Sequence, residues 1–124
     1  VHKHLSEKGL FFVSAFIPDP VFLYQGDDLH AATSFFTYRN KQCRVMEKNT
    51  YHEGTQINHI TWTIETDGML SDESYTFKQR MYPPHMMDIL LNETGFTIKE
   101  KYGNWDRALL DEFSPMQIYI CRKK

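Results

Sequence analysis

Hydrophobic residues gather near the N-terminus in the run Leu10–Ile17, which contains no charged residue and no proline or glycine. A short run that is almost wholly apolar is typical of a strand covered on both faces of its sheet. The residues before this run are compatible with a helix. The helix is predicted to end at Lys8, because Gly9 can take the left-handed conformation that stops a helix. Pro18 and Pro20 have no N–H to donate to a neighbouring strand, so the strand is predicted to end at Phe16 or Ile17.

Polar and apolar residues alternate between Thr33 and Tyr82, and turn-forming residues interrupt the alternation. This pattern predicts antiparallel strands with one face in water. In the third strand, the face that carries Ile60, Trp62 and Ile64 is predicted to be the buried one. The four predicted strands are Thr33–Arg39, Cys43–His52, Gln56–Thr66 and Ser74–Tyr82.

A helix and two further strands are predicted in the C-terminal part of the chain. The helix begins at Pro83-Pro84, since a first helical turn accepts proline, and ends at Gly95. The segments Phe96–Tyr102 and Met116–Cys121 then alternate as strands do. The predicted buried stripe of the helix consists of Met86, Ile89 and Leu90, widened by Met87 and Leu91.

Composition narrows the classes of function. The chain has 124 residues, of which 41% are hydrophobic and 15% aromatic, enough for the core of one globular unit. Lys and Arg total 14 against 16 Asp and Glu, so we expect no nucleic acid partner. No apolar run reaches the roughly 18 residues of a membrane span and no signal-peptide pattern is present, so we expect a cytoplasmic protein. Cys43 and Cys121 are expected to be reduced thiols in strands.

Several segments, in this order, resemble class I methyltransferases that use S-adenosylmethionine (SAM). In that family a leucine, a few polar residues and two glycines lead into the fifth strand of a seven-stranded Rossmann-like sheet; here Leu10 replaces the second glycine. A leucine pair followed by Gly-Phe leads into the sixth strand, which pairs antiparallel with the seventh. The order and spacing of the motifs carry the resemblance over nearly the whole chain. The segments are Leu5–Val13, Arg80–Pro83, Leu90–Phe96 and Tyr102–Asp106, with the tail Gln117–Lys123.

The resemblance implies an α/β fold that is the C-terminal portion of this Rossmann-like sheet, with residues 33–82 inserted as an antiparallel β lid over a small-molecule substrate. The sequence contains no Asp-x-Gly-x-Gly loop after an apolar strand and no acidic residue placed to hold a ribose. Those features belong to the family's N-terminal, SAM-binding half, which we expect to be absent here, and the first residue is Val1. SAM is therefore implied for the parent protein and not for this chain alone, which we expect to be inactive.

The substrate-binding candidates include no catalytic residue, because methyl transfer depends mainly on orientation and desolvation. Phe16 ends the first strand, where open α/β sheets bind ligands, although plain core packing is an equal alternative. Arg80 and Tyr82 are expected on one side of the fourth lid strand, offering a cation and a hydroxyl. Their structural alternatives are a surface ion pair for Arg80 and a half-buried strand tyrosine for Tyr82.

Three more candidates, Tyr102, Trp105 and Asp106, follow the strand at 96–102, and the resemblance places this loop near the mouth of the active site. For Trp105 the alternative is a cap over the sheet edge. Metal binding is not expected, since the histidine pairs do not converge: His52 and His59 flank a hairpin without lying directly opposite one another.

Two other interpretations remain open. The chain could be a non-enzymatic α+β protein whose lid strands grip a hydrophobic ligand against the helix after Pro83. The methyltransferase interpretation predicts that Leu10–Ile17 runs parallel to Phe96–Tyr102 in an α/β sheet, whereas this alternative predicts an all-antiparallel sheet. Self-association through an exposed apolar sheet edge is a further expectation. The sequence does not identify the methyl acceptor or distinguish O-, N- and C-methylation.

Overall fold

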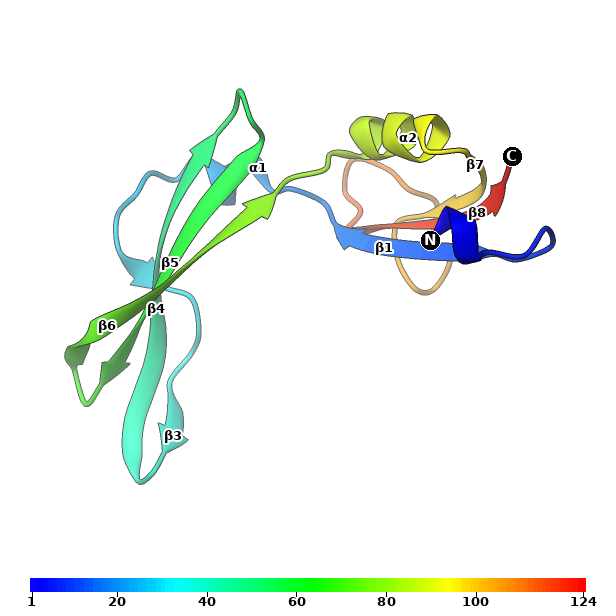
Figure 1. Cartoon of the computed structure of the whole chain (residues 1–124). Coiled ribbons are helices and arrows are strands. Elements are labelled where there is room, and N and C mark those ends of the chain that lie inside the picture. Colours follow the sequence, from blue (N-terminus) through cyan, green and yellow to red (C-terminus); the bar gives the residue numbers. More distant parts are fainter. The chain divides into compact units, whose positions relative to one another are not determined.

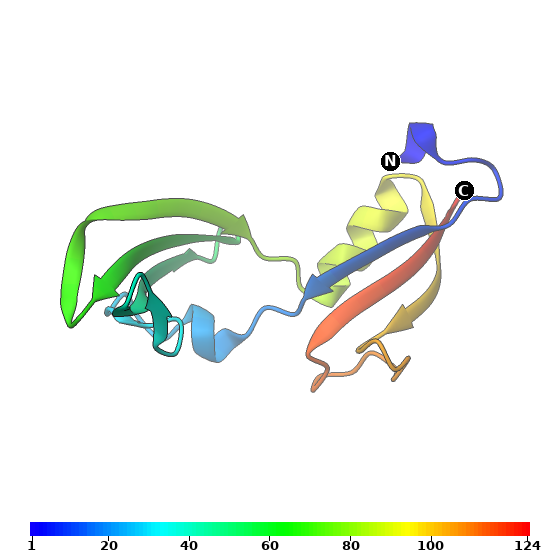
Figure 2. The same cartoon turned by 90° about the horizontal axis from the view of Figure 1, so that it is seen from below.

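The computed structural model describes residues 1–124, which form two compact units in place of the single one expected from the length. The core unit comprises Val1–Pro18 and Tyr82–Lys124. The insert unit, Asp19–Met81, lies between those two segments in the sequence. Figures 1 and 2 show the elements of each unit from two sides. None of the helices is long and apolar enough to cross a membrane.

Three strands form the sheet of the core unit. They are β1 (Phe11–Phe16), β7 (Phe96–Tyr102) and β8 (Met116–Lys123), in the spatial order β1-β8-β7. Both pairings are antiparallel, so β1 and β7 run in the same direction on either side of β8. The antiparallel pairing of β7 with β8 is the one that the resemblance implied. β1 and β7 run parallel, as the methyltransferase interpretation predicted, but β8 lies between them and every pairing is antiparallel. Strand pairing alone therefore does not separate the methyltransferase interpretation from the ligand-binding alternative.

Helix α2 (Pro84–Glu93) covers one face of this sheet (Figure 1). Gly95, with φ +89°, ends the helical segment as predicted. The predicted apolar stripe is partly confirmed: Met87 is 7% and Leu91 4% exposed, but Ile89 is 54% and Leu90 40% exposed. The stripe is wider than the surface that the sheet covers, so only part of it is buried. The buried cluster consists of Met87, Leu91, Phe96, Tyr119 and Cys121.

Strand β1 is covered on one face only. Its residues Phe11, Val13 and Ala15 pack against the buried cluster, whereas Phe12 on the opposite face is 60% exposed. The expectation of burial on both faces is therefore wrong for this chain, since α2 covers just one side of the sheet. The expected helix ending at Lys8 is also absent: a 3₁₀ helix, η1, spans His2–His4 and a turn follows.

Gln117 of β8 joins the two places where the chain leaves and re-enters the core unit. Its side chain is fully buried, and its Nε2 donates to the carbonyl oxygen of Phe16 at 3.2 Å and to that of Tyr82 at 2.6 Å. The Tyr119 hydroxyl donates to Gln117 Oε1 at 2.9 Å, which fixes the orientation of the amide. One side chain thus fastens both ends of the insertion to the central strand.

The insert unit is an antiparallel sheet with the order β2-β4-β5-β6, and β3 also pairs with β4. Two-residue turns with positive φ join the neighbouring strands at Arg39-Asn40 and at Asp67-Gly68. The second turn lets the last strand begin at Met69, earlier than predicted, and a bulge opposite Ile64 absorbs the extra residues. Its elements are α1 (Pro20–Leu23), β2 (His30–Ala31), β3 (Phe36–Tyr38), β4 (Lys41–His52), β5 (Ile57–Thr66) and β6 (Met69–Arg80).

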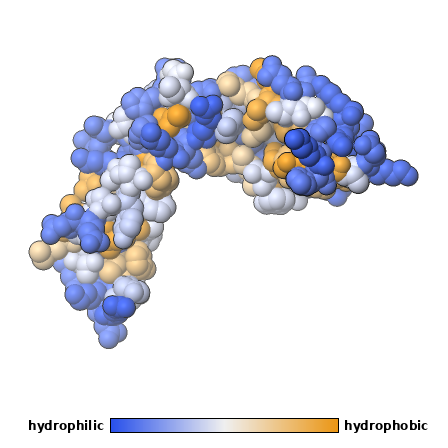
Figure 3. All heavy atoms as spheres, in the orientation of Figure 1, coloured by the Kyte–Doolittle hydropathy of each residue, from blue (hydrophilic) through white to orange (hydrophobic).

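The inward face of β5 is partly as predicted. Ile60 is 4% exposed and Asn58 on the same face is fully buried, but Trp62 is 41% exposed. The prediction is confirmed for Ile60 and wrong for Trp62, because the segment containing α1 and β2 covers only part of this face. Figure 3 shows hydrophobic side chains remaining at the surface of both units.

Replacing Leu91 by Ala should lower the free energy of unfolding by about 2 to 4 kcal/mol, because the change leaves a cavity in the buried cluster. Replacing its neighbour Leu90, which is 40% exposed, should cost less than about 1 kcal/mol. Urea unfolding followed by circular dichroism measures both. Equal losses would contradict the assignment of the buried face.

Replacing Gln117 by Leu should cost about 2 to 3 kcal/mol, because the carbonyls of Phe16 and Tyr82 and the Tyr119 hydroxyl lose the partner that they share. The matched change Thr97→Leu, at an exposed position of the neighbouring strand, should stay within about 0.5 kcal/mol. Amide hydrogen exchange at the end of β1 reports the same loss locally. Unchanged protection there would argue against the bridging role.

Candidate functional site

Five of the six substrate-binding candidates lie in the core unit, and Arg80 ends β6 in the insert unit. Phe16 is the last residue of β1 and faces Met116 across the ladder, while Tyr102 is the last residue of β7 and faces Ile118. The carboxyl ends of β1 and β7 therefore lie at the same end of the sheet, on either side of β8. Trp105 and Asp106 belong to the β7–β8 connection at this end.

The backbones of Phe16 and Tyr82 are fixed, whereas the Phe16 ring is free to make contacts. Phe16 is 46% exposed, so it is not a core residue, and its carbonyl accepts from Gln117. Tyr82 lies beyond the end of β6 and packs half-buried against the cluster under α2. The expectation that Arg80 and Tyr82 share one side of a strand is wrong, because the strand stops at Arg80.

Arg80 is exposed and takes part in none of the ion pairs of the structure. The surface ion pair considered for it is therefore not formed. Its backbone pairs with Ile57 at the start of β5.

The β7–β8 connection exposes two aromatic side chains, Trp105 and Phe113, and Asp106 stabilises a turn within it. Trp105 is 69% exposed and does not cap the sheet edge. Asp106 Oδ1 accepts the backbone N–H of Ala108 at 2.9 Å, which closes a turn. The Tyr102 hydroxyl donates to the Glu100 carboxylate, and this hydrogen bond raises the pKa of Tyr102 above its ordinary value.

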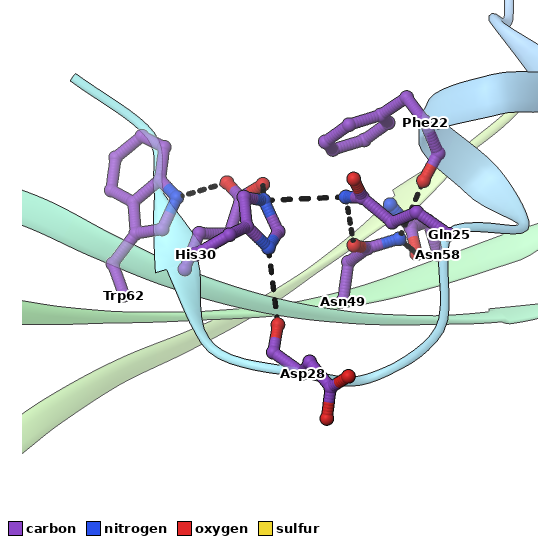
Figure 4. A network of polar contacts seen from close by, with 8 residues as sticks. Phe22, Gln25, Asp28, His30, Asn49, Asn58 and Trp62 are labelled. Atoms are coloured by element: carbon purple, nitrogen blue, oxygen red, sulfur yellow. Dashed lines mark hydrogen bonds and ion pairs between the residues drawn. The ribbon is translucent and has the colours of Figure 1, made fainter.

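A second group of polar residues, not singled out by the sequence, lies on the inward face of the insert unit (Figure 4). Glu47 is only 6% exposed. The Trp62 indole N–H donates to its Oε2 at 2.5 Å, and His30 Nε2 lies 3.2 Å from its Oε1. The other ring nitrogen of His30 lies 3.1 Å from the carbonyl oxygen of Asp28. Three strands thus converge on one buried carboxylate.

Amide side chains extend this network into the interior. Gln25 Nε2 donates to Asn49 Oδ1 at 2.9 Å and lies 3.2 Å from His30 Nε2. Asn49 Nδ2 in turn donates to the carbonyl of Phe22 at 3.3 Å and to Asn58 Oδ1 at 3.4 Å. The Nδ2 of Asn58 is buried and has no partner. The network holds residues 22–30 against β4 and orients the groups around Glu47.

A signal for this network was present in the hairpin register. Glu47 and Asn49 are polar residues at inward-facing positions of β4, opposite Trp62 and Ile60 of β5. A polar residue across the ladder from a large apolar one, on the buried face, indicates a group that needs a specific partner. Alternation alone did not reveal it, because Glu47 and Asn49 fit a strand in either orientation.

A pocket of about 530 Å³ opens over this network. The carboxylate of Glu47 and the ring of His30 form its polar part, and Phe22 and Trp62 supply aromatic surface. The complete lining is Phe22, Gln25, His30, Ala31, Ala32, Thr33, Val45, Glu47 and Trp62, and we call this space the insert pocket.

Metal-binding side chains do not converge anywhere in the chain: no group of three or more His, Cys, Asp or Glu residues could hold an ion. His52 faces Ile57 and His59 faces Thr50, but the two histidine rings touch diagonally with centroids 4.9 Å apart. Cys43 and Cys121 are free and buried in strands, as expected.

The fold, unlike the sequence, has recognisable relatives. No protein-family model matches the chain, and no curated protein sequence matches it. The CcbJ methyltransferase from Streptomyces caelestis superposes with a TM-score of 0.77 at 16% identity, over 98% of this chain and 46% of its own. An S-adenosylmethionine-dependent methyltransferase from Clostridium acetobutylicum superposes with a TM-score of 0.67 at 14% identity, over 98% of this chain and 47% of its own.

Another similar structure is that of CalS10 from Micromonospora echinaspora, an amino pentose methyltransferase solved with SAM bound. It matches with a TM-score of 0.58 at 8% identity, over 99% of this chain and 47% of its own. The chain thus has the fold of about half of a SAM-dependent methyltransferase, and it spans about half the length of the structures that it matches.

The residues present do not fit SAM as a ligand of this chain alone. Rossmann-like sheets hold a nucleoside cofactor at a glycine-rich turn between a strand and a helix N-terminus. Here α2 is instead preceded by Pro83, and β1 is followed by Pro18. No step of methyl transfer is therefore assigned to these residues.

Replacing Asn49 by Ala should destabilise the insert unit by about 2 kcal/mol or more, because it removes a hydrogen-bond partner from Gln25, from Asn58 and from the Phe22 carbonyl. The adjacent change Thr50→Ala, at an exposed position, should stay within about 0.5 kcal/mol. Thermal unfolding monitored by circular dichroism compares the two. A neutral Asn49→Ala variant would mean that water replaces the network at no cost.

Proposed function

We propose that this chain is the C-terminal, substrate-side portion of a SAM-dependent methyltransferase acting on a small molecule. The observation that carries the proposal is the asymmetric match: the chain superposes over 98% of its length on the CcbJ methyltransferase but covers 46% of that protein. A chain that forms a complete small fold is expected to match other proteins over most of their length. A portion of a larger fold is expected to match over its own full length but over only part of the other protein, as this chain does.

The exposed side of β1 supports the same proposal. β1 is the outermost strand of its sheet, so its outer edge is unpaired. Leu10 is 43% exposed and Phe12 60%, and both line a pocket of about 520 Å³ on the uncovered face. An unpaired strand beside exposed apolar side chains is costly in water unless another element covers it. We propose that the SAM-binding half continues the sheet along this edge, with a second copy of the chain as the competing occupant.

The methyl acceptor is proposed to be a small molecule bearing a sugar or a sugar amine. Two of the similar structures are named as an amino pentose methyltransferase and, in KedS8 from Streptoalloteichus, as a sugar N-methyltransferase. KedS8 matches with a TM-score of 0.57 at 10% identity, over 99% of this chain and 46% of its own. Catalysis would then consist of holding the acceptor in line with the methyl donor in a dry site. The proposed substrate contacts remain Phe16, Arg80, Tyr82, Tyr102, Trp105 and Asp106.

The alternative of a non-enzymatic ligand-binding protein receives less support. It required the helix after Pro83 to close a groove with the strands of the insert. Instead, α2 packs on β7 and β8 through Met87 and Leu91, and it belongs to the core unit.

The 124-residue chain alone should show no SAM binding in isothermal titration calorimetry and no transfer of labelled methyl groups. A longer product of the same reading frame, including residues encoded upstream of Val1, should bind SAM and carry a glycine-rich loop after an apolar strand. The expected difference arises because the short chain lacks a backbone cradle for the cofactor.

Micromolar SAM binding by the 124-residue chain would overturn the proposal that this chain is only the substrate-side portion. An upstream sequence without a strand and glycine-rich loop would overturn the methyltransferase assignment. Size-exclusion chromatography at several concentrations separates the two occupants of the β1 edge, since only self-association gives a concentration-dependent size.

A further inference from the structure

We propose that the insert pocket binds a protonated amine carried on a compact ring, with the Glu47 carboxylate receiving the amine and Trp62 packing against the ring. The pocket lies wholly within the insert unit, and none of the six substrate-binding candidates lines it. Three features of the insert unit carry this inference: a buried carboxylate without a permanent counter-charge, exposed aromatic surface beside it, and a rigid polar support.

The charge of Glu47 has no permanent counter-charge. His30 is its one ion-pair partner and is charged only when protonated. Arg44, three residues before Glu47 in β4, is engaged elsewhere, with Nε 2.8 Å and Nη2 3.0 Å from the Glu65 carboxylate. A carboxylate can accept about four hydrogen bonds, and Glu47 accepts one from Trp62 and at most one from His30. Acceptor capacity for a cationic donor therefore remains.

Aromatic surface lies directly beside this carboxylate. The Trp62 N–H is bound to Glu47, which fixes the plane of the indole, yet the residue is 41% exposed. The Phe77 ring meets it edge to face with centroids 4.9 Å apart, which supports the indole from β6. A cation is attracted to the face of an indole, and a ring packs well on the same surface. A purely structural Glu47–Trp62 bond would not explain why the indole stays exposed.

The polar groups are held in place before any ligand arrives. Gln25 and Asn49 anchor the segment that carries His30, and Asn49 is 1% exposed. Ligand sites of this kind are mostly apolar, with a few fixed polar groups that set the ligand's orientation. The volume of about 530 Å³ suits a ligand of one or two rings.

Amine binding by the pocket does not depend on methyl transfer. The further statement that the bound amine is the methyl acceptor, or part of it, rests on the proposed function. The two can therefore fail separately.

The test is a titration followed by two-dimensional NMR of the isotope-labelled 124-residue chain, which contains two tryptophans. Cyclohexylamine is the probe and cyclohexanol is its neutral match in shape. The Trp62 indole N–H resonance should shift saturably with the amine, with at least about fivefold tighter binding than for the alcohol. The backbone N–H resonance of Leu91, in the buried cluster of the core unit, should not shift and serves as the internal control.

Two variants assign the preference to one carboxylate. Glu47→Gln should remove the preference for the amine, while Glu65→Gln, which makes the same charge change outside the pocket, should keep it. Equal binding of amine and alcohol by the unaltered chain, or no saturable shift at Trp62, would overturn the proposal even if Glu47→Gln fails to fold. Amine binding together with a longer chain that binds no SAM would leave the pocket established and the methyltransferase assignment refuted.

Discussion

The bridge made by Gln117 is the constraint on which the architecture depends. A chain that leaves a sheet for a separate unit and then returns needs its departure and return points held together. Gln117 does this from the middle strand by donating to the carbonyls of Phe16 and Tyr82. The Gln117 side chain is fully buried, so water competes little for its amide. The core unit can therefore keep its own sheet while the insert unit forms a second one.

Periodicity in the sequence located most strands but did not say what covers them. The boundaries of β7 and the course of β4 and β5 followed from alternation and turn residues, because these are local properties. Which side of α2 faces the sheet, and which side of β1 stays bare, depend on elements distant in the sequence. The predicted apolar stripe contained Ile89 and Leu90 as well as Met87 and Leu91, and tertiary packing decided that only the second pair is buried.

Of the candidate sites, the sequence identified the residues at the end of the core sheet but not the network around Glu47. Placing Phe16 and Tyr102 at one end of the sheet required only strand direction and order, and the structure brings them there. The network around Glu47 depends on the contact of β2 with β4, and β2 is two residues long with no pattern of its own. A cluster assembled from a short strand, a hairpin and a loop leaves only scattered polar residues in the sequence.

The insertion also sets an order for folding. The ladder between β1 and β8 joins Phe11 to Cys121, whereas the hairpins of the insert unit close through turns of a few residues. Closing a long loop costs more entropy than closing a short one, and contacts between distant residues slow folding. Once the insert has formed, the stretch that must be closed behaves as a much shorter tether. We infer that the hairpins form first and that β8 completes the core sheet late.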